Sequence, residues 1–186
     1  MRKALTLTIS ILCFAVIQST AQGRYNGYVI TNENDTVYGI IEVGNPALQA
    51  VRVIFTDYEV HSPVQLEPFQ IKRYYANNQL FQSKIYDLDE GLDYGYAVFM
   101  EVVEDGYVTF YKYWNNDRRR FERLLEDSNK SMMLVTKSKF SNKMSEYFKD
   151  HENLRTKILR GAYKWKDLDK IVYEYNAWKG NLNHSN

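Results

Sequence analysis

Short runs of β-branched and aromatic residues, separated by polar turns, fill most of the chain between residues 27 and 135. The turn signals recur about every 8–12 residues, a spacing typical of an antiparallel sandwich or barrel. One such signal is Asn77 followed by Asn78, because asparagine tolerates the positive φ angles of a tight hairpin turn. Residues 71–76 and 80–85 flank this pair, so the pattern predicts a hairpin there.

Other segments have the same strand-like composition and extend the pattern into a β-meander. Asp105 and Gly106 form a good hairpin turn between two of them. These segments are residues 28–41 around a polar turn at 32–35, residues 51–55, 96–103, 107–114, 118–125 and 132–135.

From residue 140 onward the apolar residues recur with helical spacing, in the segments 140–148, 154–159 and 168–175. In the third segment Leu168, Ile171, Val172 and Tyr175 share one face, which we expect to pack on the sheet.

The residues that flank these segments suggest where the helices begin and end. Ser141 and Asp150 are expected N-caps, and Gly161 and Gly180 are expected helix ends. The sequence therefore predicts an α+β, mainly β fold. It is an antiparallel β-meander, sandwich or barrel-like, with a C-terminal helical segment of two to three short helices. We expect one domain over residues 22–180, with strands at about 27–135, helices at about 140–180 and a frayed tail at 181–186.

The first 21 residues have the three parts of a secretory signal peptide. A basic start precedes an apolar run of 14 residues, too short for a membrane span, which needs about 20. Small residues at 19 and 21 predict cleavage between Ala21 and Gln22. We therefore expect an exported protein that is periplasmic, outer-membrane associated or secreted, with no transmembrane span in the mature chain.

Cys13 is the only cysteine, and it lies within the expected signal peptide. The mature chain would then contain no disulfide and no cysteine ligand for a metal. A lipoprotein anchored through Cys13 is the alternative, but Leu12 stands where a small residue is needed.

Charge is distributed unevenly along the chain. Residues 22–128 hold 10 Lys and Arg against 17 Asp and Glu, while residues 129–186 hold 12 against 6. A solvated, lysine-rich helical tail explains this, and the alternative is a basic face that docks on an acidic partner or an anionic surface. No nucleic-acid motif is present, so we expect no nucleic-acid partner. The oligomeric state is left open.

Residues for covalent or metal-dependent catalysis are scarce. The chain has three histidines and no G-x-S-x-G motif, so we predict neither a hydrolytic triad, nor a histidine metal site, nor a cofactor. The acidic segment with Asp87, Asp89, Glu90 and Asp93 is a weak calcium candidate. Its spacing does not fit an EF-hand, and a solvated acidic loop is the simpler interpretation.

Aromatic residues are abundant, with 16 Tyr, 9 Phe and 3 Trp. Most pack across strands in proteins of this type, but tyrosine and tryptophan also offer flat contact area to a glycan or a protein. In the segment 107–114, Tyr111 and Tyr113 share one strand face, and Phe110 and Trp114 share the other. Tyr111, Tyr113 and Trp114 are therefore the candidate binding residues.

Two stretches resemble a known but uncharacterised family of exported Bacteroidetes-type proteins. One is GYVITNENDTVYGII at residues 27–41. The other is YFKD at 147–150, followed by DLDKIV at 167–172 and YN at 175–176. The resemblance implies a signal peptide, a β-rich body and a short helical C-terminus. The first stretch is also similar to the N-terminal portion of some longer outer-membrane β-barrel proteins. The resemblance implies no activity and no site residues.

These observations favour a non-enzymatic binding or interaction module of the cell envelope, or a secreted one, whose partner is an envelope protein or a glycan. The first alternative is a glycan-active enzyme that uses acidic residues. The second is a structural subunit of an envelope assembly that docks through its basic helices. A concave pocket that holds two facing carboxylates near aromatic residues would favour the enzyme. A flat aromatic surface without such a pair would favour the module.

Overall fold

One antiparallel sheet of ten strands forms the body of the protein, with helices packed against part of it. The computed structural model describes residues 23–86 and 96–183. Within these residues the expected fold class is confirmed: the protein is mainly β, with a meandering antiparallel sheet and a helical C-terminal segment.

The elements follow the chain in this order. The strands are β1 (Gly23–Thr31), β2 (Thr36–Val43), β3 (Val53–Asp57), β4 (Pro63–Leu66), β5 (Ile71–Ala76), β6 (Gln79–Tyr86), β7 (Tyr96–Glu104), β8 (Thr109–Asn115), β9 (Arg120–Glu126) and β10 (Met132–Leu134). The helices are α1 (Pro46–Gln49), α2 (Phe140–Tyr147), α3 (Glu152–Leu159) and α4 (Leu168–Asn183), and a 3-10 turn at Trp165–Asp167 leads into α4.

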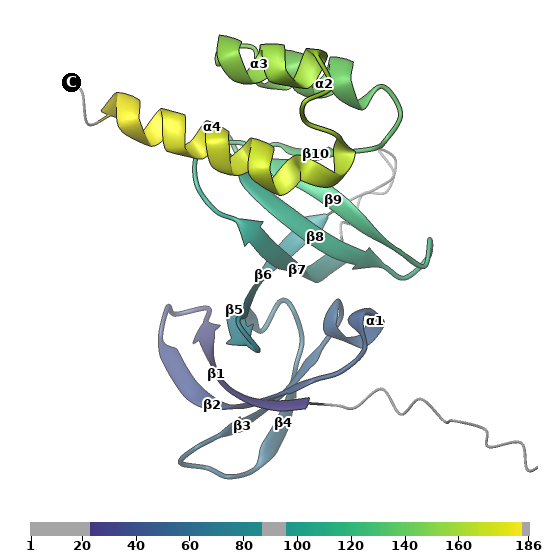
Figure 1. Ribbon diagram of the computed structural model, residues 1–186. Coiled ribbons are helices and arrows are strands. Elements are labelled where there is room, and N and C mark those ends of the chain that lie inside the picture. Colours follow the sequence, from purple (N-terminus) through teal and green to yellow (C-terminus); the bar gives the residue numbers. More distant parts are fainter. Residues whose placement is uncertain (1–22, 87–95, 184–186) are drawn as a thin grey trace, which may run out of the picture.

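The strands are arranged in the order β10-β9-β8-β7-β6-β5-β1-β2-β3-β4. The end strands β4 and β10 each have one partner among the described strands, so the sheet is open and not a closed barrel. In Figure 1, α2–α4 lie over β7–β10, and β1–β4 with α1 occupy the lower half. Strands β5 and β6 connect the two halves (Figure 1).

The hairpin predicted at Asn77 and Asn78 is confirmed. These two residues have φ angles of 50° and 59° and join β5 directly to β6. Both angles lie in the left-handed region that a two-residue hairpin turn of this kind requires, and asparagine adopts it more readily than most residues.

A first apolar core fills the lower half of the molecule, between β1–β3, β5–β7 and the segment that contains α1. A backbone hydrogen bond of 2.9 Å from the Phe99 N–H to the Ala50 carbonyl ties that segment to β7. The buried members of this core are Val29, Ile41, Val53, Phe55, Ile71, Tyr74, Ala76, Phe81 and Phe99.

A second core lies between the sheet and helices α2–α4. Leu168, Ile171 and Val172 are fully buried in it, and Tyr175 is 8% exposed. The expected packing of these four side chains against the sheet is therefore confirmed. Phe110 and Leu125 contribute from β8 and β9, so α4 is part of the folded body and not a detachable arm.

The helix ends differ in part from the sequence prediction. Lys139, not Ser141, is the N-cap of α2, and the Ser141 hydroxyl instead donates a 2.7 Å hydrogen bond to the Ile158 carbonyl in α3. Gly161 has a φ of +73° and follows α3 as expected. Helix α4 continues through Gly180 to Asn183, because Gly180 does not take the positive φ that ends a helix.

Cross-strand pairing places one row of side chains on a single face across eight strands. The row runs Tyr38, Tyr28, Tyr75, Leu80, Val102, Tyr111, Leu124 and Leu134. Because side chains alternate along each strand, this face is opposite the one that carries both cores described above. At the β8–β10 end the row is covered, and Tyr111 and Leu124 are buried in a third apolar cluster. At the β1–β2 end it is open to solvent.

In the described part of the chain, no helix is both long and apolar enough to cross a membrane.

Candidate functional site

The open end of this row carries Tyr28, Tyr38 and Tyr75, and Tyr58 lies beside Tyr38. We call these four tyrosines the tyrosine face. Pairing of β1 with both β2 and β5 sets Tyr28 directly between Tyr38 and Tyr75. Tyr58 follows β3, and its N–H donates to the Tyr38 carbonyl at 3.4 Å. Four separate segments therefore contribute one aromatic side chain each.

Three of the four rings of the tyrosine face form ring–ring contacts. Tyr28 and Tyr75 stack with ring centroids 5.4 Å apart and an interplanar angle of 12°. Tyr38 meets Tyr28 edge-on, at 6.0 Å and 65°. Tyr38 and Tyr58 are 62% and 44% exposed. Cross-strand contacts thus hold the rings in place while leaving aromatic surface open to a ligand.

Amide side chains border the tyrosine face. The Tyr58 hydroxyl donates to Asn26 Oδ1 at 2.9 Å, and the Tyr75 hydroxyl donates to Asn78 Oδ1 at 3.2 Å. The hydroxyls of Tyr28 and Tyr38 form no hydrogen bond within the described residues. This border can donate and accept hydrogen bonds around an apolar centre.

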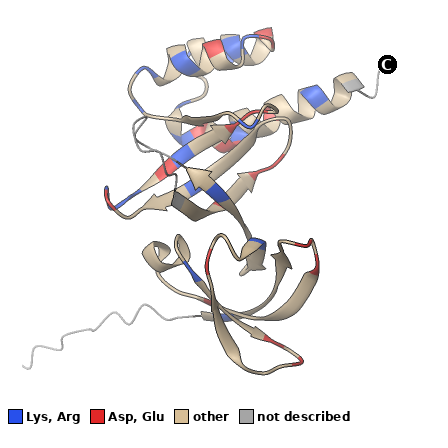
Figure 2. Ribbon diagram, turned by 180° about the vertical axis from the view of Figure 1, so that it is seen from behind, with Lys and Arg blue, Asp and Glu red and all other residues tan. Residues whose placement is uncertain are grey.

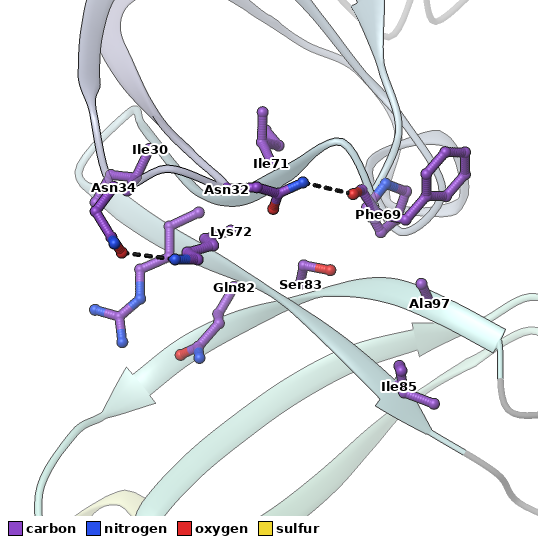
Figure 3. Close-up of a pocket in the computed structure, with 12 residues that line it drawn as sticks. Ile30, Asn32, Asn34, Phe69, Ile71, Lys72, Gln82, Ser83, Ile85 and Ala97 are labelled. Carbon is purple, nitrogen blue, oxygen red and sulfur yellow. Dashed lines mark hydrogen bonds between the residues drawn. The ribbon is translucent and has the colours of Figure 1, made fainter.

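A cleft of about 680 Å³ adjoins the tyrosine face, and we call it the cationic cleft. Figure 3 shows Lys72 beside Asn34 at one end, and Ile85 on β6 with Ala97 on β7 toward the other. Its polar lining consists of Asn32, Asn34, Lys72, Arg73, Gln82 and Ser83. None of the described lining residues is acidic.

Hydrogen bonds hold parts of the cationic cleft in shape. Lys72 Nζ donates to Asn34 Oδ1 at 2.7 Å, and Asn32 Nδ2 donates to the Phe69 carbonyl at 2.9 Å (Figure 3). Arg73 forms neither a hydrogen bond nor an ion pair within the described residues. Within the described part of the chain, the guanidinium group of Arg73 in this cleft is therefore unpaired.

The three aromatic residues predicted from the sequence lie elsewhere, and their binding role stays a prediction. Tyr111 is 1% exposed, and its hydroxyl lies 2.9 Å from Glu126 Oε2 and 3.1 Å from Gln82 Oε1. Tyr113 is half-buried on the same face. Trp114 is half-buried on the opposite face, edge-on to Phe121 at 5.1 Å. The structure does not bring these three rings together into one surface.

A buried polar network lies next to Tyr111. Lys84 Nζ is 2.7 Å from each carboxylate oxygen of Glu126, and the two side chains are 14% and 6% exposed. Burial, followed by the hydrogen bond to Glu126, raises the pKa of the Tyr111 hydroxyl. Because Gln82 also lines the cationic cleft, this network supports one wall of the cleft from behind.

A second pocket, of about 450 Å³, contains carboxylates near aromatic residues. Glu104, Asp169 and Glu174 line it together with Tyr163 and Tyr173. Burial, and then the charge of Asp169, raises the pKa of Glu104. For Glu174 partial burial opposes ionisation, but hydrogen bonds from the side chains of Lys157 and Tyr163 outweigh it and lower its pKa.

Five of the twelve basic residues in the C-terminal segment form ion pairs with acidic residues of the same segment. Figure 2 shows basic and acidic residues side by side on the helices. Ion pairs in this segment are Lys149–Glu146, Arg155–Glu152, Lys157–Glu174, Lys170–Asp167 and Lys179–Asp150. The helices therefore do not present a uniform basic face.

The calcium candidate with Asp87, Asp89, Glu90 and Asp93 lies outside the described residues, as do Ala21 and Gln22 at the expected cleavage site. Residues 23–86 and 96–183 contain no cluster of three or more His, Cys, Asp or Glu side chains that could hold a metal ion.

Comparison with known proteins assigns no family: no family model, no curated protein and no solved structure matches this chain.

Proposed function

We propose that this protein is an exported, non-enzymatic binding module that recognises a glycan of the cell envelope through its tyrosine face. The observation that carries the proposal is the exposed ring of Tyr38, which meets Tyr28 edge-on beside the stack of Tyr28 on Tyr75. Flat aromatic rings provide a large contact area at a low cost in conformational entropy, because tyrosine has few rotatable bonds. Sugar rings have apolar faces that suit such a surface.

The polar border of the tyrosine face favours a glycan over a purely apolar partner. Hydroxyl and amide groups of Tyr28, Tyr38, Asn26 and Asn78 lie around the rings, and the first two hydroxyls have no hydrogen bond within the described residues. A sugar ring that stacks on tyrosine directs its own hydroxyl groups outward, toward such a border. The apolar face of the sugar would then contact the tyrosine rings, and its hydroxyl groups would form hydrogen bonds with the border.

Export is part of this proposal, and its support is the tripartite pattern of residues 1–21. The mass of the protein purified from its source tests it. Cleavage before Gln22 is the expected result, and an intact Met1 or a lipid on Cys13 would contradict it.

Glycan binding is tested by titrating a panel of oligosaccharides into the purified protein by calorimetry. Tyr38→Ala should raise the Kd of a bound oligosaccharide about tenfold, the effect expected for an aromatic contact at the centre of a binding surface. Tyr173→Ala is the matched control, because Tyr173 on α4 is 64% exposed and Tyr38 is 62% exposed. Binding that depends on Tyr173 and not on Tyr38 would contradict the proposal.

A second candidate function is a glycan-active enzyme, and the carboxylate pocket on α4 favours it. Glu104 and Glu174 have pKa values shifted in opposite directions within one pocket, as in an acid–base pair. However, Lys157 and Tyr163 hold both oxygens of Glu174, at 2.9 and 2.7 Å. Hydrolysis of an oligosaccharide that Glu104→Gln abolishes would establish this candidate. Binding without turnover would support the module.

A further inference from the structure

We propose that the cationic cleft binds the acidic group of a negatively charged glycan whose sugar rings lie on the tyrosine face. This inference rests on the proposed function and names its ligand class. The acidic group is a carboxylate, a sulfate ester or a phosphate ester, since all three present paired oxygens to a cation.

The positive charge of the cleft suits an anionic ligand. Lys72 and Arg73 line it, and the described lining residues include no carboxylate that would neutralise them. An anion that enters would therefore meet two positive charges inside a concave, partly apolar site, where attraction is stronger than on an open surface.

The two cations of the cleft differ in how they are held. Asn34 fixes Lys72 Nζ at 2.7 Å, so this ammonium group is held at the end of the cleft. Arg73 has no hydrogen-bond or ion-pair partner within the described residues, and its planar fork matches two oxygens of a carboxylate or an ester. We expect the acidic group of the ligand to accept two hydrogen bonds from Arg73 and to form an ion pair with the ammonium group of Lys72.

Strand register fixes the distance between the cleft and the tyrosine face. Ile30 pairs with Arg73, and Tyr28 pairs with Tyr75, on the same two strands. Arg73 therefore lies two residues from Tyr75 on the same face, a separation of about 7 Å along the strand. One oligosaccharide can cover both sites at once.

The other walls of the cleft suit a sugar ring. Phe69 and Ile85 are 66% and 73% exposed, so their apolar surface is available for contact. Asn32, Asn34, Gln82 and Ser83 offer hydrogen-bonding groups between them. The volume of about 680 Å³ falls in the range of small-molecule sites, roughly 300–1,000 Å³.

The test compares oligosaccharides of equal length that are neutral, uronate-containing, sulfated or phosphorylated, with an acidic peptide of the same charge as a further ligand. Calorimetry would measure Kd for the wild type and for Arg73→Gln, Arg73→Lys, Lys72→Gln and Tyr38→Ala. Arg160→Gln is the control, because Arg160 is an exposed arginine at the end of α3. Circular dichroism would verify that each variant is folded.

We expect acidic oligosaccharides to bind at least tenfold more tightly than neutral ones, with affinity that falls as salt is added. Arg73→Gln should raise the Kd of the acidic ligand about tenfold, Arg73→Lys less, and Arg160→Gln not at all. The preferred acidic group distinguishes carboxylate from ester.

Several results would overturn the inference. Equal affinity for neutral and acidic oligosaccharides, with affinity lost in Tyr38→Ala alone, would show that the cationic cleft does not bind the acidic group. The proposed function would remain intact. Acidic ligands that require Arg73 but not Tyr38 would support the anion site and contradict the tyrosine face. Equal binding of the acidic peptide would overturn the assignment to glycans.

Discussion

Tyr28 and Tyr75 stack in nearly parallel planes, with ring centroids 5.4 Å apart, although 46 residues separate them in the sequence. Their contact depends on the pairing of β1 with β5, which joins the first strand to the middle of the sheet. The same pairing sets Ile30 opposite Arg73 and so positions the cationic cleft. The binding surface is therefore a direct product of the sheet topology.

Close approach of β1 to β5 requires a glycine at position 27. A Cβ added to Gly27 would collide with the carbonyl oxygen of Tyr75. Gly27→Ala should therefore lower the free energy of unfolding by about 1–3 kcal/mol, as overpacking does, and should also weaken glycan binding. Urea denaturation checks the first effect. Gly180→Ala is the control, because nothing lies near its added Cβ and alanine favours a helix by about 0.5–1 kcal/mol. Equal stability of the two variants would contradict this view of Gly27.

Helix α4 should contribute strongly to stability through its buried face. Ile171 is fully buried, and Ile171→Ala should cost about 2–5 kcal/mol because it leaves a cavity. Tyr173→Ala, on the exposed face of the same helix, should stay within about 0.5 kcal/mol of the wild type. Chemical denaturation measures both. A small effect of Ile171→Ala would mean that α4 does not belong to the cooperative core.

The Lys84–Glu126 pair should show strong coupling in a double-mutant cycle. Lys84→Met leaves the 6% exposed Glu126 without its cation and should cost about 3–5 kcal/mol. Replacing both residues, Lys84→Met with Glu126→Leu, should recover most of that loss, since no unpaired charge remains. The Tyr111 hydroxyl keeps Gln82 Oε1 as a partner in the double variant. Additive losses would show that the pair is not coupled.

Glu104 should make the protein less stable as pH rises. Burial, and then the charge of Asp169, raises its pKa above 4.5 in the folded state, so folding favours the protonated form. That contribution is present below pH 4.5 and is lost as pH rises through the folded-state pKa. Glu104→Gln should therefore raise Tm relative to the wild type at pH 7 but not at pH 3.

The control for Glu104 is Glu146, whose pKa is lowered by the hydrogen bond from Lys149 and by its charge. Glu146→Gln should have the opposite sign at pH 7 and lower Tm slightly. Thermal melts at the two pH values measure both variants. An unchanged Tm for Glu104→Gln at pH 7 would contradict the assigned cause.

Local signals were enough to predict much of the fold. The turn at Asn77 and Asn78 follows from the tolerance of asparagine for positive φ, and the buried face of α4 follows from helical spacing. Helix α1 had a local signal that the prediction overlooked. Asn45 Oδ1 accepts from the Leu48 N–H at 3.0 Å, and Pro46 occupies the first turn, a common helix start.

The binding surface depended on pairing between distant strands and was not predicted. Alternation correctly separated the faces of β8, yet it could not say that the face of Tyr111 would be covered. Part of the tyrosine face was accessible from the sequence, since the hairpin at residues 28–41 can set Tyr28 opposite Tyr38. Tyr75 could not be added, because its register with β1 is non-local and includes an irregularity at Ile30 and Thr31.

The most direct measurement of the central claim is a map of amide chemical shifts in the isotope-labelled protein during titration with a bound oligosaccharide. The account predicts the largest changes at Tyr28, Tyr38 and Tyr75, with further changes at Arg73 for an acidic ligand. Amides near Tyr173 should not move. Changes concentrated at Glu104, Asp169 and Glu174, with none on β1, β2 and β5, would contradict it.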